Sequence, residues 1–210
     1  MKAAYYEENG AAADVMIIGD VETPEPGPGE VRVQIATSGV NPSDVKTRAG
    51  TVRKIGFDRV IPHSDGAGTI DKIGDGVSPA RVGERVWIWN GQWKRPFGTA
   101  AEYITLPEAM AVKLPDSASF EVGACLGIPA MTAVHAVSLA DAGPNTTVLV
   151  SGGAGAVANY AIQFAQARGA RVPTTVSSPA KAPMASAPCP AQTNDYKRAT
   201  PTPPNQTTTH

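Results

Sequence analysis

Short apolar runs separated by Gly and Pro make up the first half of the chain. In "VRVQI" (31–35) apolar and polar residues alternate, and in "VWIW" (86–89) Val86 and Ile88 share one face while the two tryptophans share the other. A period of two is typical of strands. Turn residues recur at close intervals between such runs, so the pattern predicts a β-rich, barrel-like domain over residues 1–118.

The apolar residues change to a helical period over residues 119–142, where Gly and Pro end the pattern. A strand over 147–151, a glycine-rich turn, a helix over 155–168 and a second strand over 170–176 are expected to follow. Strand, helix and strand in this order are typical of a parallel sheet. We therefore predict the first part of an α/β domain over residues 119–178.

The pattern stops after the second of these strands. Residues 177–210 contain no Val, Ile, Leu, Phe or Trp but hold seven of the chain's 19 prolines. A segment of this composition buries too little apolar surface to offset the entropy that is lost on ordering. We expect residues 179–210 to be a disordered, aberrant tail and the α/β domain to be incomplete, so that the chain is C-terminally truncated.

The 210 residues carry a formal net charge of −1, and the Lys and Arg residues are scattered along the chain. Without a basic cluster there is no electrostatic case for nucleic acid or an anionic membrane as a partner. Acidic residues interrupt the N-terminal stretch "MKAAYYEENGAAAD", and no apolar window is long enough to cross a bilayer. We predict a globular, cytoplasmic protein.

Two cysteines are too few for a disulfide framework or a four-cysteine zinc site. Cys125 lies in "VGACLGIPAM", an apolar stretch with a helical period. This setting predicts a buried, unreactive thiol.

A glycine-rich turn joins the first predicted strand of the α/β domain to its helix. Gly153-x-Gly155-x-x-Ala158 fits the G-x-G-x-x-G/A pattern of dinucleotide-binding turns, and Gly152 adds a further permissive position. Glycine lets the backbone approach a pyrophosphate closely, and the following helix presents free N–H groups to it. The sequence predicts a dinucleotide site here, while a glycine-rich turn without a ligand is the second interpretation.

The end of the second strand indicates which dinucleotide binds. An acidic residue there would accept a hydrogen bond from the ribose of NAD, but this chain has "TTVSSPAK" (174–181). Ser177 and Lys181 offer a hydroxyl and a positive charge, which suit the 2′-phosphate of NADPH. We predict NADPH as the cofactor; the other interpretation is that Lys181 only solvates a disordered tail.

Several motifs in a fixed order together resemble one family. They are "GVNPSDVKTRAG", "PHSDGAGTI", "GERVWIWN", "GTAAEYITLP", "MTAVHAV" and "VLVSGGAGAVANYAIQFAQARGARV". From Met1 to about Lys181 the chain resembles the zinc-free quinone oxidoreductases, the ζ-crystallin-like branch of the medium-chain dehydrogenase/reductase superfamily. The resemblance implies a β-rich GroES-like barrel domain followed by a Rossmann domain, here incomplete, with NADPH and substrate in the cleft between them. It also implies hydride transfer to a quinone or an activated alkene, and a homodimer in the family.

The resemblance implies roles for single residues as well. Asn41 and Asp44 of "NPSD" would lie near the nicotinamide and the substrate, and Thr132 of "MTA" near the nicotinamide ring. No cysteine stands near Asn41, and His63-Ser64-Asp65 replaces the Gly-His-Glu of zinc-dependent relatives, so no catalytic zinc is expected. The pyrophosphate would contact Gly152, Gly153, Gly155, Ala156 and Val157, and the 2′-phosphate would contact Ser177, Lys181 and Tyr196 of "NDYKR".

The first hypothesis is an NADPH-dependent, zinc-independent reductase whose activity is impaired by the incomplete domain. The second is a non-catalytic GroES-like barrel that acts as a binding or structural module. Stabilisation of the fold by NADPH distinguishes the two. An enoyl-reductase unit of a larger synthase is disfavoured because Met1 opens directly into the first barrel strand.

Overall fold

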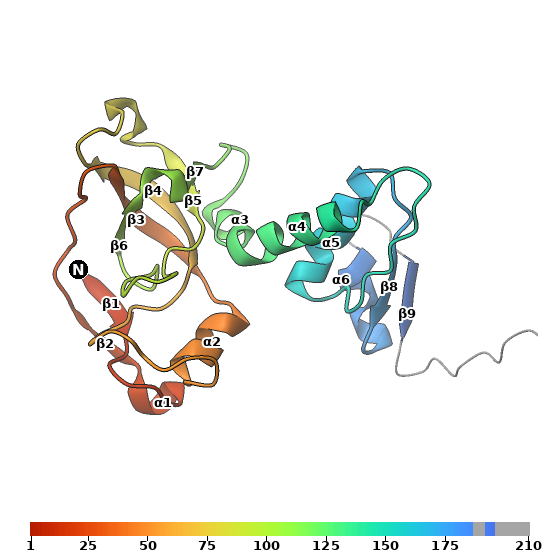
Figure 1. Ribbon diagram of the computed structural model, residues 1–210, viewed down its shortest axis with the longest axis horizontal. Helices are drawn as coiled ribbons and strands as arrows, with labels where there is room; N and C mark the ends of the chain where they lie inside the picture. Colours follow the sequence, from red (N-terminus) through yellow and green to blue (C-terminus); the bar gives the residue numbers. More distant parts are fainter. Residues whose placement is uncertain (187–191, 196–210) are drawn as a thin grey trace, which may run out of the picture. The chain divides into compact units, whose positions relative to one another are not determined.

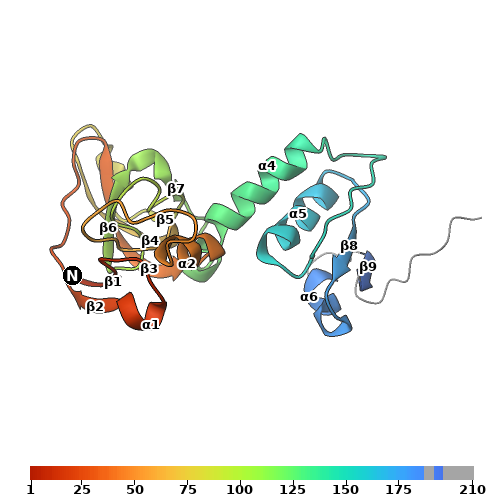
Figure 2. The same ribbon diagram turned by 60° about the horizontal axis from the view of Figure 1, so that its bottom comes forward.

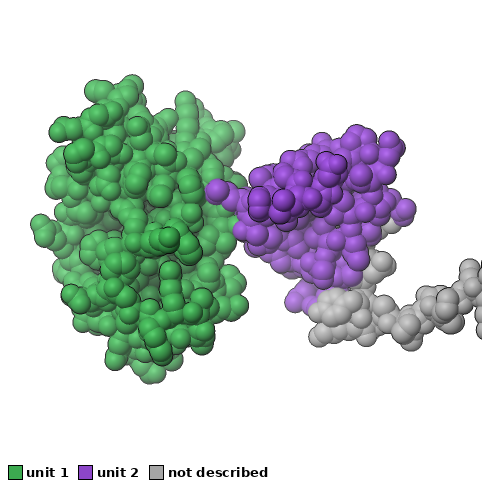
Figure 3. Space-filling model, viewed as in Figure 1, with its two compact units in different colours: residues 1–128 green, residues 129–210 purple. Residues whose placement is uncertain are grey.

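The computed structural model describes residues 1–186 and 192–195, and the chain divides into two compact units, residues 1–128 and 129–210 (Figure 3). Each unit has its own hydrophobic core. The domain limits predicted at residues 118 and 178 stay predictions. Tyr196, which the resemblance assigns to the cofactor site, lies outside the described residues.

A five-stranded antiparallel sheet forms the frame of the N-terminal unit (Figure 1). Its strand order is β6-β3-β4-β5-β7, so the sheet is open, with β6 and β7 at its edges. Strands β1 and β2 form a separate antiparallel pair on either side of the short helix α1, Ala12–Val15. The strands are β1 Lys2–Tyr5, β2 Ile17–Asp20, β3 Glu30–Gly39, β4 Asp65–Ile73, β5 Arg85–Ile88, β6 Tyr103–Pro107 and β7 Ala111–Lys113.

The core of the N-terminal unit consists of inward-facing aliphatic residues of this sheet. In β3, Val31 and Val33 are fully buried, whereas Arg32 between them forms an ion pair with Asp71 of the neighbouring strand. This is the alternation that the sequence predicts for a strand with one buried face. Burying each large aliphatic side chain contributes about 1.5–3 kcal/mol relative to leaving it exposed. The core residues are Val31, Val33, Ile70, Val77, Val86, Ile88, Ile104, Leu106 and Ala111.

Residues 119–142, for which the sequence predicts a helical period, contain three short helical segments. They are α3, Phe120–Gly123, the π-helical turn η3, Leu126–Ala130, and α4, Met131–Leu139. Pro129 lies inside η3, where a proline cannot donate the hydrogen bond of a regular α-helix. Cys125 falls between α3 and η3 and is exposed. The prediction of a buried thiol is therefore wrong, because α3 ends at Gly123, two residues before Cys125.

In the C-terminal unit, helix α4 packs against helix α5, Ala156–Ala167 (Figure 2). Small residues fill this contact: Ala133 of α4 and Ala165 of α5 are both fully buried. Strand β8, Pro173–Val176, pairs in parallel with β9, Gln192–Asp195. The parallel pairing that the predicted order of strand, helix and strand requires is a different one, between residues 147–151 and the second strand.

The strand expected over residues 147–151 is present only as two isolated parallel bridges to the second strand. In the hydrogen-bond ladder between the two segments, the backbone N–H groups of Arg171 and Thr175 donate to the carbonyls of Thr146 and Val150. The residue midway between these donors is Pro173, which has no N–H. The missing hydrogen bond interrupts the ladder and explains why no continuous strand forms there.

The structure places order in part of the segment for which the sequence predicts disorder. The turn η4, Pro179–Lys181, leads into the short helix α6, Ala182–Ser186. Ala185 is buried, and the side-chain amide of Asn159 in α5 donates to the carbonyl of Met184. The buried Ala185 and this hydrogen bond help to hold the segment against the unit. Throughout the described residues, no helix is both long enough and apolar enough to cross a membrane.

Candidate functional site

Helix α2, Pro42–Arg48, begins just after β3, and its first turn positions two of the predicted site residues. Asn41 precedes the helix, and Pro42 takes the first helical position, where the missing N–H of proline costs no hydrogen bond. The backbone N–H of Asn41 donates to the Asp44 carboxylate over 2.8 Å. This contact turns Asp44 back toward the start of the helix and leaves the side-chain amide of Asn41 available for another partner.

That partner is Asp65, the first residue of β4. Asn41 Nδ2 donates to Asp65 Oδ2 over 2.8 Å, and the backbone N–H of Ile128 donates to both carboxylate oxygens over 2.9 and 3.0 Å. Asp65 is only 1% exposed. A β-carbon on Gly127 would lie 2.1 Å from Asp65 Oδ1, so this close approach requires glycine. The buried carboxylate therefore joins α2, β4 and η3 at one point.

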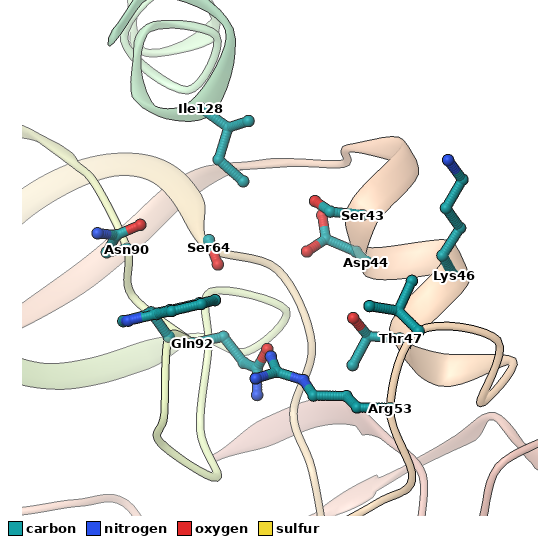
Figure 4. Close-up of a pocket in the computed structure, with 11 residues that line it drawn as sticks. Ser43, Asp44, Lys46, Thr47, Arg53, Ser64, Asn90, Gln92 and Ile128 are labelled. Carbon is teal, nitrogen blue, oxygen red and sulfur yellow. The ribbon is translucent and has the colours of Figure 1, made fainter. Parts of the chain in front are cut away.

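A pocket of about 590 Å³ opens beside this junction (Figure 4). Ser43 and Asp44 line it from α2, and Ser64 lines it from the residue before β4. Asn90 and Gln92 line it from the segment after β5. The volume falls within the range of sites for small organic molecules. The other lining residues are Lys46, Thr47, Val52, Arg53, Trp93 and Ile128.

Burial raises the pKa of the Asp44 carboxyl to about 6; the hydrogen bond from Asn41 opposes this rise and the nearby Asp65 carboxylate adds to it. Burial also raises the pKa of Asp65, against the hydrogen bonds from Ile128 and Asn41. A carboxyl group with a pKa near 6 can exchange a proton close to neutral pH. Asp44 is therefore suited to hold or release a proton at the pocket wall.

This pKa predicts a pH dependence of stability. The ordinary pKa of an aspartate is 3.8, so between about pH 4 and pH 6 the folded chain binds more protons at Asp44 than the unfolded chain does. The free energy of unfolding should fall as the pH rises through this range, by on the order of 2 kcal/mol from this group. Urea unfolding of Asp44→Asn at both ends of the range should show that this part of the decrease is gone. An unchanged decrease would contradict a buried, readily protonated Asp44.

His63 belongs to a chain of hydrogen bonds that supports the start of β4. Its Nδ1 lies 2.9 Å from Ser38 Oγ, which lies 2.8 Å from Thr99 Oγ1. Thr99 in turn donates to the backbone carbonyl of Asp65 over 2.6 Å. Burial lowers the pKa of His63. Among the residues that the structure describes, no three His, Cys, Asp or Glu side chains are grouped as a metal site would require.

The glycine-rich turn of the C-terminal unit lines a second pocket, of about 340 Å³. Four predicted cofactor residues meet there: Gly152 and Gly155 from the turn, Ser177 from just beyond β8, and Lys181 from η4. Gly152 has a φ of 72°, which side chains rarely allow. Backbone, hydroxyl and ammonium groups thus surround one cavity, a donor set that fits a phosphorylated ligand. Ala154, Val176 and Met184 complete the lining.

Gly153 serves the packing of the turn. A β-carbon at this position would lie 2.3 Å from Thr174 Oγ1 and 3.0 Å from Ile162 Cδ1. Thr174 is fully buried, and its hydroxyl donates to the carbonyl of Val150. Glycine at position 153 therefore lets β8 and α5 approach each other, which is the close helix–strand packing that the dinucleotide pattern requires.

Three further predicted residues lie on the helices of the C-terminal unit. Ala156 and Val157 form the first turn of α5, directly after Gly155. Thr132 is exposed in the first turn of α4. Their roles beside the pyrophosphate and the nicotinamide stay predictions.

Comparisons with known proteins identify relatives for most of the chain. Residues 27–116 match the model of the alcohol dehydrogenase GroES-like domain. The quinone oxidoreductase of Rattus norvegicus is 34% identical over 179 residues, which are 85% of this chain and 53% of the relative. That of Pseudomonas aeruginosa is 34% identical over 173 residues, 82% of this chain and 52% of the relative. The chain spans about half the length of these curated relatives.

Solved structures resemble both units of the chain. The quinone oxidoreductase of Pseudomonas syringae pv. Tomato superposes with a TM-score of 0.81 at 34% identity, over 94% of this chain and 59% of that one. A mycobacterial protein solved in complex with NADPH has a TM-score of 0.81 at 31% identity, over 95% and 60%. These comparisons confirm a GroES-like domain followed by part of a Rossmann-like α/β region, with open sheets in the described residues.

Proposed function

Because the chain belongs to the quinone oxidoreductase type of the medium-chain dehydrogenases/reductases, a family of oxidoreductases, we propose that it binds NADPH and reduces a quinone or an activated alkene. The observation that carries the proposal is the pocket at which Gly152, Gly155, Ser177 and Lys181 meet. NADPH, when bound, supplies the hydride. The residues of the chain bind and orient the two reactants.

The proposed cofactor site uses the donor groups of the C-terminal unit. Gly152, Gly155 and the first N–H groups of α5 would hold the pyrophosphate, with Gly153 keeping helix and strand close. Ser177 and Lys181 would hold the 2′-phosphate. The mycobacterial relative that was solved with NADPH supports this choice of cofactor.

The proposed substrate site is the pocket beside Asp44. Reduction of a quinone or an activated alkene adds a hydride and a proton, and Asp44, with its pKa of about 6, would supply the proton. Asn41 would position this region through its hydrogen bond to Asp65, and Thr132 would lie near the nicotinamide. Such electron-poor substrates need no Lewis acid, and the residues at positions 41 and 63–65 are not those of the zinc-dependent relatives.

Replacing Lys181 tests the cofactor assignment. We expect NADPH to raise the melting temperature of the chain more than NADH does. Lys181→Ala should weaken NADPH binding about tenfold or more, because a charge-assisted contact to a phosphate is worth about 1.5–3 kcal/mol, and should leave NADH binding unchanged. Calorimetric titration with both cofactors measures the difference. Lys113→Ala, at an exposed lysine of β7, is the control.

Equal losses for NADPH and NADH would contradict the role of Lys181 at the 2′-phosphate. If neither cofactor stabilised the chain, a non-catalytic binding module built on the GroES-like domain would be the better proposal. The N-terminal unit favours that second candidate in one respect, since it has its own core and its own pocket. A homodimer and a cytoplasmic location stay predictions.

A further inference from the structure

Two basic side chains line the pocket beside Asp44. Lys46 comes from α2 and Arg53 from the segment that follows it. Within the part of the chain that the structure describes, neither side chain forms an ion pair. Asp44 is the one acidic residue of the lining, so two cationic side chains face one carboxyl group. The pocket wall therefore carries an excess of positive charge.

Arg53 is placed to contact a flat ligand in this pocket. Figure 4 shows its side chain reaching toward Gln92, while Lys46 extends from α2. The guanidinium carbon of Arg53 lies 5.4 Å from the ring centroid of Trp93, and the Lys94 ammonium lies 5.8 Å from the same ring. Trp93 is 53% exposed. A guanidinium without a carboxylate partner thus lies over part of an aromatic ring that stays half exposed.

We propose that this pocket selects substrates that carry a carboxylate or sulfonate beside their electron-poor ring, with Arg53 as the principal anion-binding group and Lys46 as an additional one. This inference rests on the proposed function, because it names the substrate class of the same site. The ring of such a substrate packs on the part of Trp93 that the guanidinium leaves exposed, as flat conjugated groups do on aromatic side chains. Its anionic group accepts charge-assisted hydrogen bonds from the guanidinium, which presents a planar fork that matches a carboxylate or sulfonate.

The anionic group of the substrate should raise the affinity for the pocket without changing how the substrate's ring binds. A neutral ligand uses only the apolar contacts and leaves the guanidinium solvated. An anionic ligand exchanges water around Arg53 for a charge-assisted contact, so a preference of about tenfold is expected at low ionic strength. Because the pocket is open to solvent, this preference should shrink when salt is added.

The test compares two ligands of the same ring system on the full chain. Anthraquinone sulfonate is the anionic probe and hydroxymethyl anthraquinone the neutral one; their fused rings block addition to the exposed Cys125 thiol. Calorimetric titration at low salt should show the sulfonate binding about tenfold more tightly. Arg53→Gln should remove most of this preference, and Lys46→Gln should remove less. Lys54→Gln, whose side chain lines a neighbouring pocket instead, should retain it.

The outcomes separate this inference from the proposed function. Equal affinity for the two probes, or a preference that survives Arg53→Gln, overturns the inference while leaving reduction of neutral quinones in place. If neither probe binds, both the inference and the proposed substrate site are overturned. A loss of NADPH binding in Arg53→Gln would mean that Arg53 holds a cofactor phosphate, and this result too would overturn the inference.

Discussion

Asp65→Ala should destabilise the N-terminal unit by about 3 kcal/mol, since it leaves buried donors without an acceptor. Asn41 Nδ2 and the backbone N–H of Ile128 both donate to this carboxylate, and no water can replace it freely at 1% exposure. The loss also releases the start of α2 from β4. We therefore expect the pocket beside Asp44 to lose its shape together with the stability.

Tryptophan fluorescence during urea unfolding isolates this effect. All three tryptophans, Trp87, Trp89 and Trp93, lie in the N-terminal unit, so the transition that they report is that of residues 1–128. Asp65→Asn, which keeps one acceptor oxygen, should cost about half as much. Asp75→Ala, at an exposed aspartate of the same unit, is the control. Equal midpoints for the Asp65 and Asp75 alanine variants would show that the three-way junction contributes no stability.

Gly153→Ala should destabilise the C-terminal unit by about 2 kcal/mol, and Gly153→Val should cost more. The added β-carbon would meet the buried Thr174 hydroxyl at 2.3 Å, a distance that no packed pair of atoms adopts. Strand β8 or helix α5 must then shift. Since the proposed cofactor pocket is built on the same turn, NADPH binding should fall along with stability.

Hydrogen exchange of the amides in α5 and β8 measures this loss, because it reports the C-terminal unit alone. Combining Gly153→Ala with Thr174→Ala removes both clashing atoms of the threonine, so the double variant should be more stable than the sum of the two single effects predicts. Gly143→Ala is the control, since the nearest atom to its β-carbon lies 4.0 Å away. Simple additivity of the two variants would contradict the steric explanation.

Local signals in the sequence predicted the alternating strand and the glycine-rich turn. The alternation in residues 31–35 lies in β3, and the glycines at 152 and 155 line a pocket with Ser177 and Lys181. The strand and the glycine turn each depend on residues close together in the chain, where backbone preference and periodicity decide the conformation. The expected strand over residues 147–151 failed because of a residue on the neighbouring strand, since Pro173 lacks the donor that a continuous ladder needs.

The sequence alone did not reveal the importance of Asp65. In the sequence, Asp65 was visible only as a departure from a zinc-binding pattern. In the structure, its carboxylate accepts hydrogen bonds from Asn41 and Ile128, which lie 24 and 63 positions away. Cys125 was assigned to the interior because its neighbours are apolar, but a break between α3 and η3 exposes it. Neither the hydrogen bonds of Asp65 nor the exposure of Cys125 could be inferred from composition, because both depend on where the helices end within the folded unit.

By itself the sequence determined the change from a β-rich to an α/β pattern, the glycine turn and the basic end of the second strand, because each is encoded within a few neighbouring residues. The tertiary structure decided which polar groups meet. It buried Asp65 beneath Asn41, raised the pKa of Asp44 by removing it from water, and set Arg53 over Trp93. Those contacts join distant segments, and only folding fixes their distances and the solvent around them.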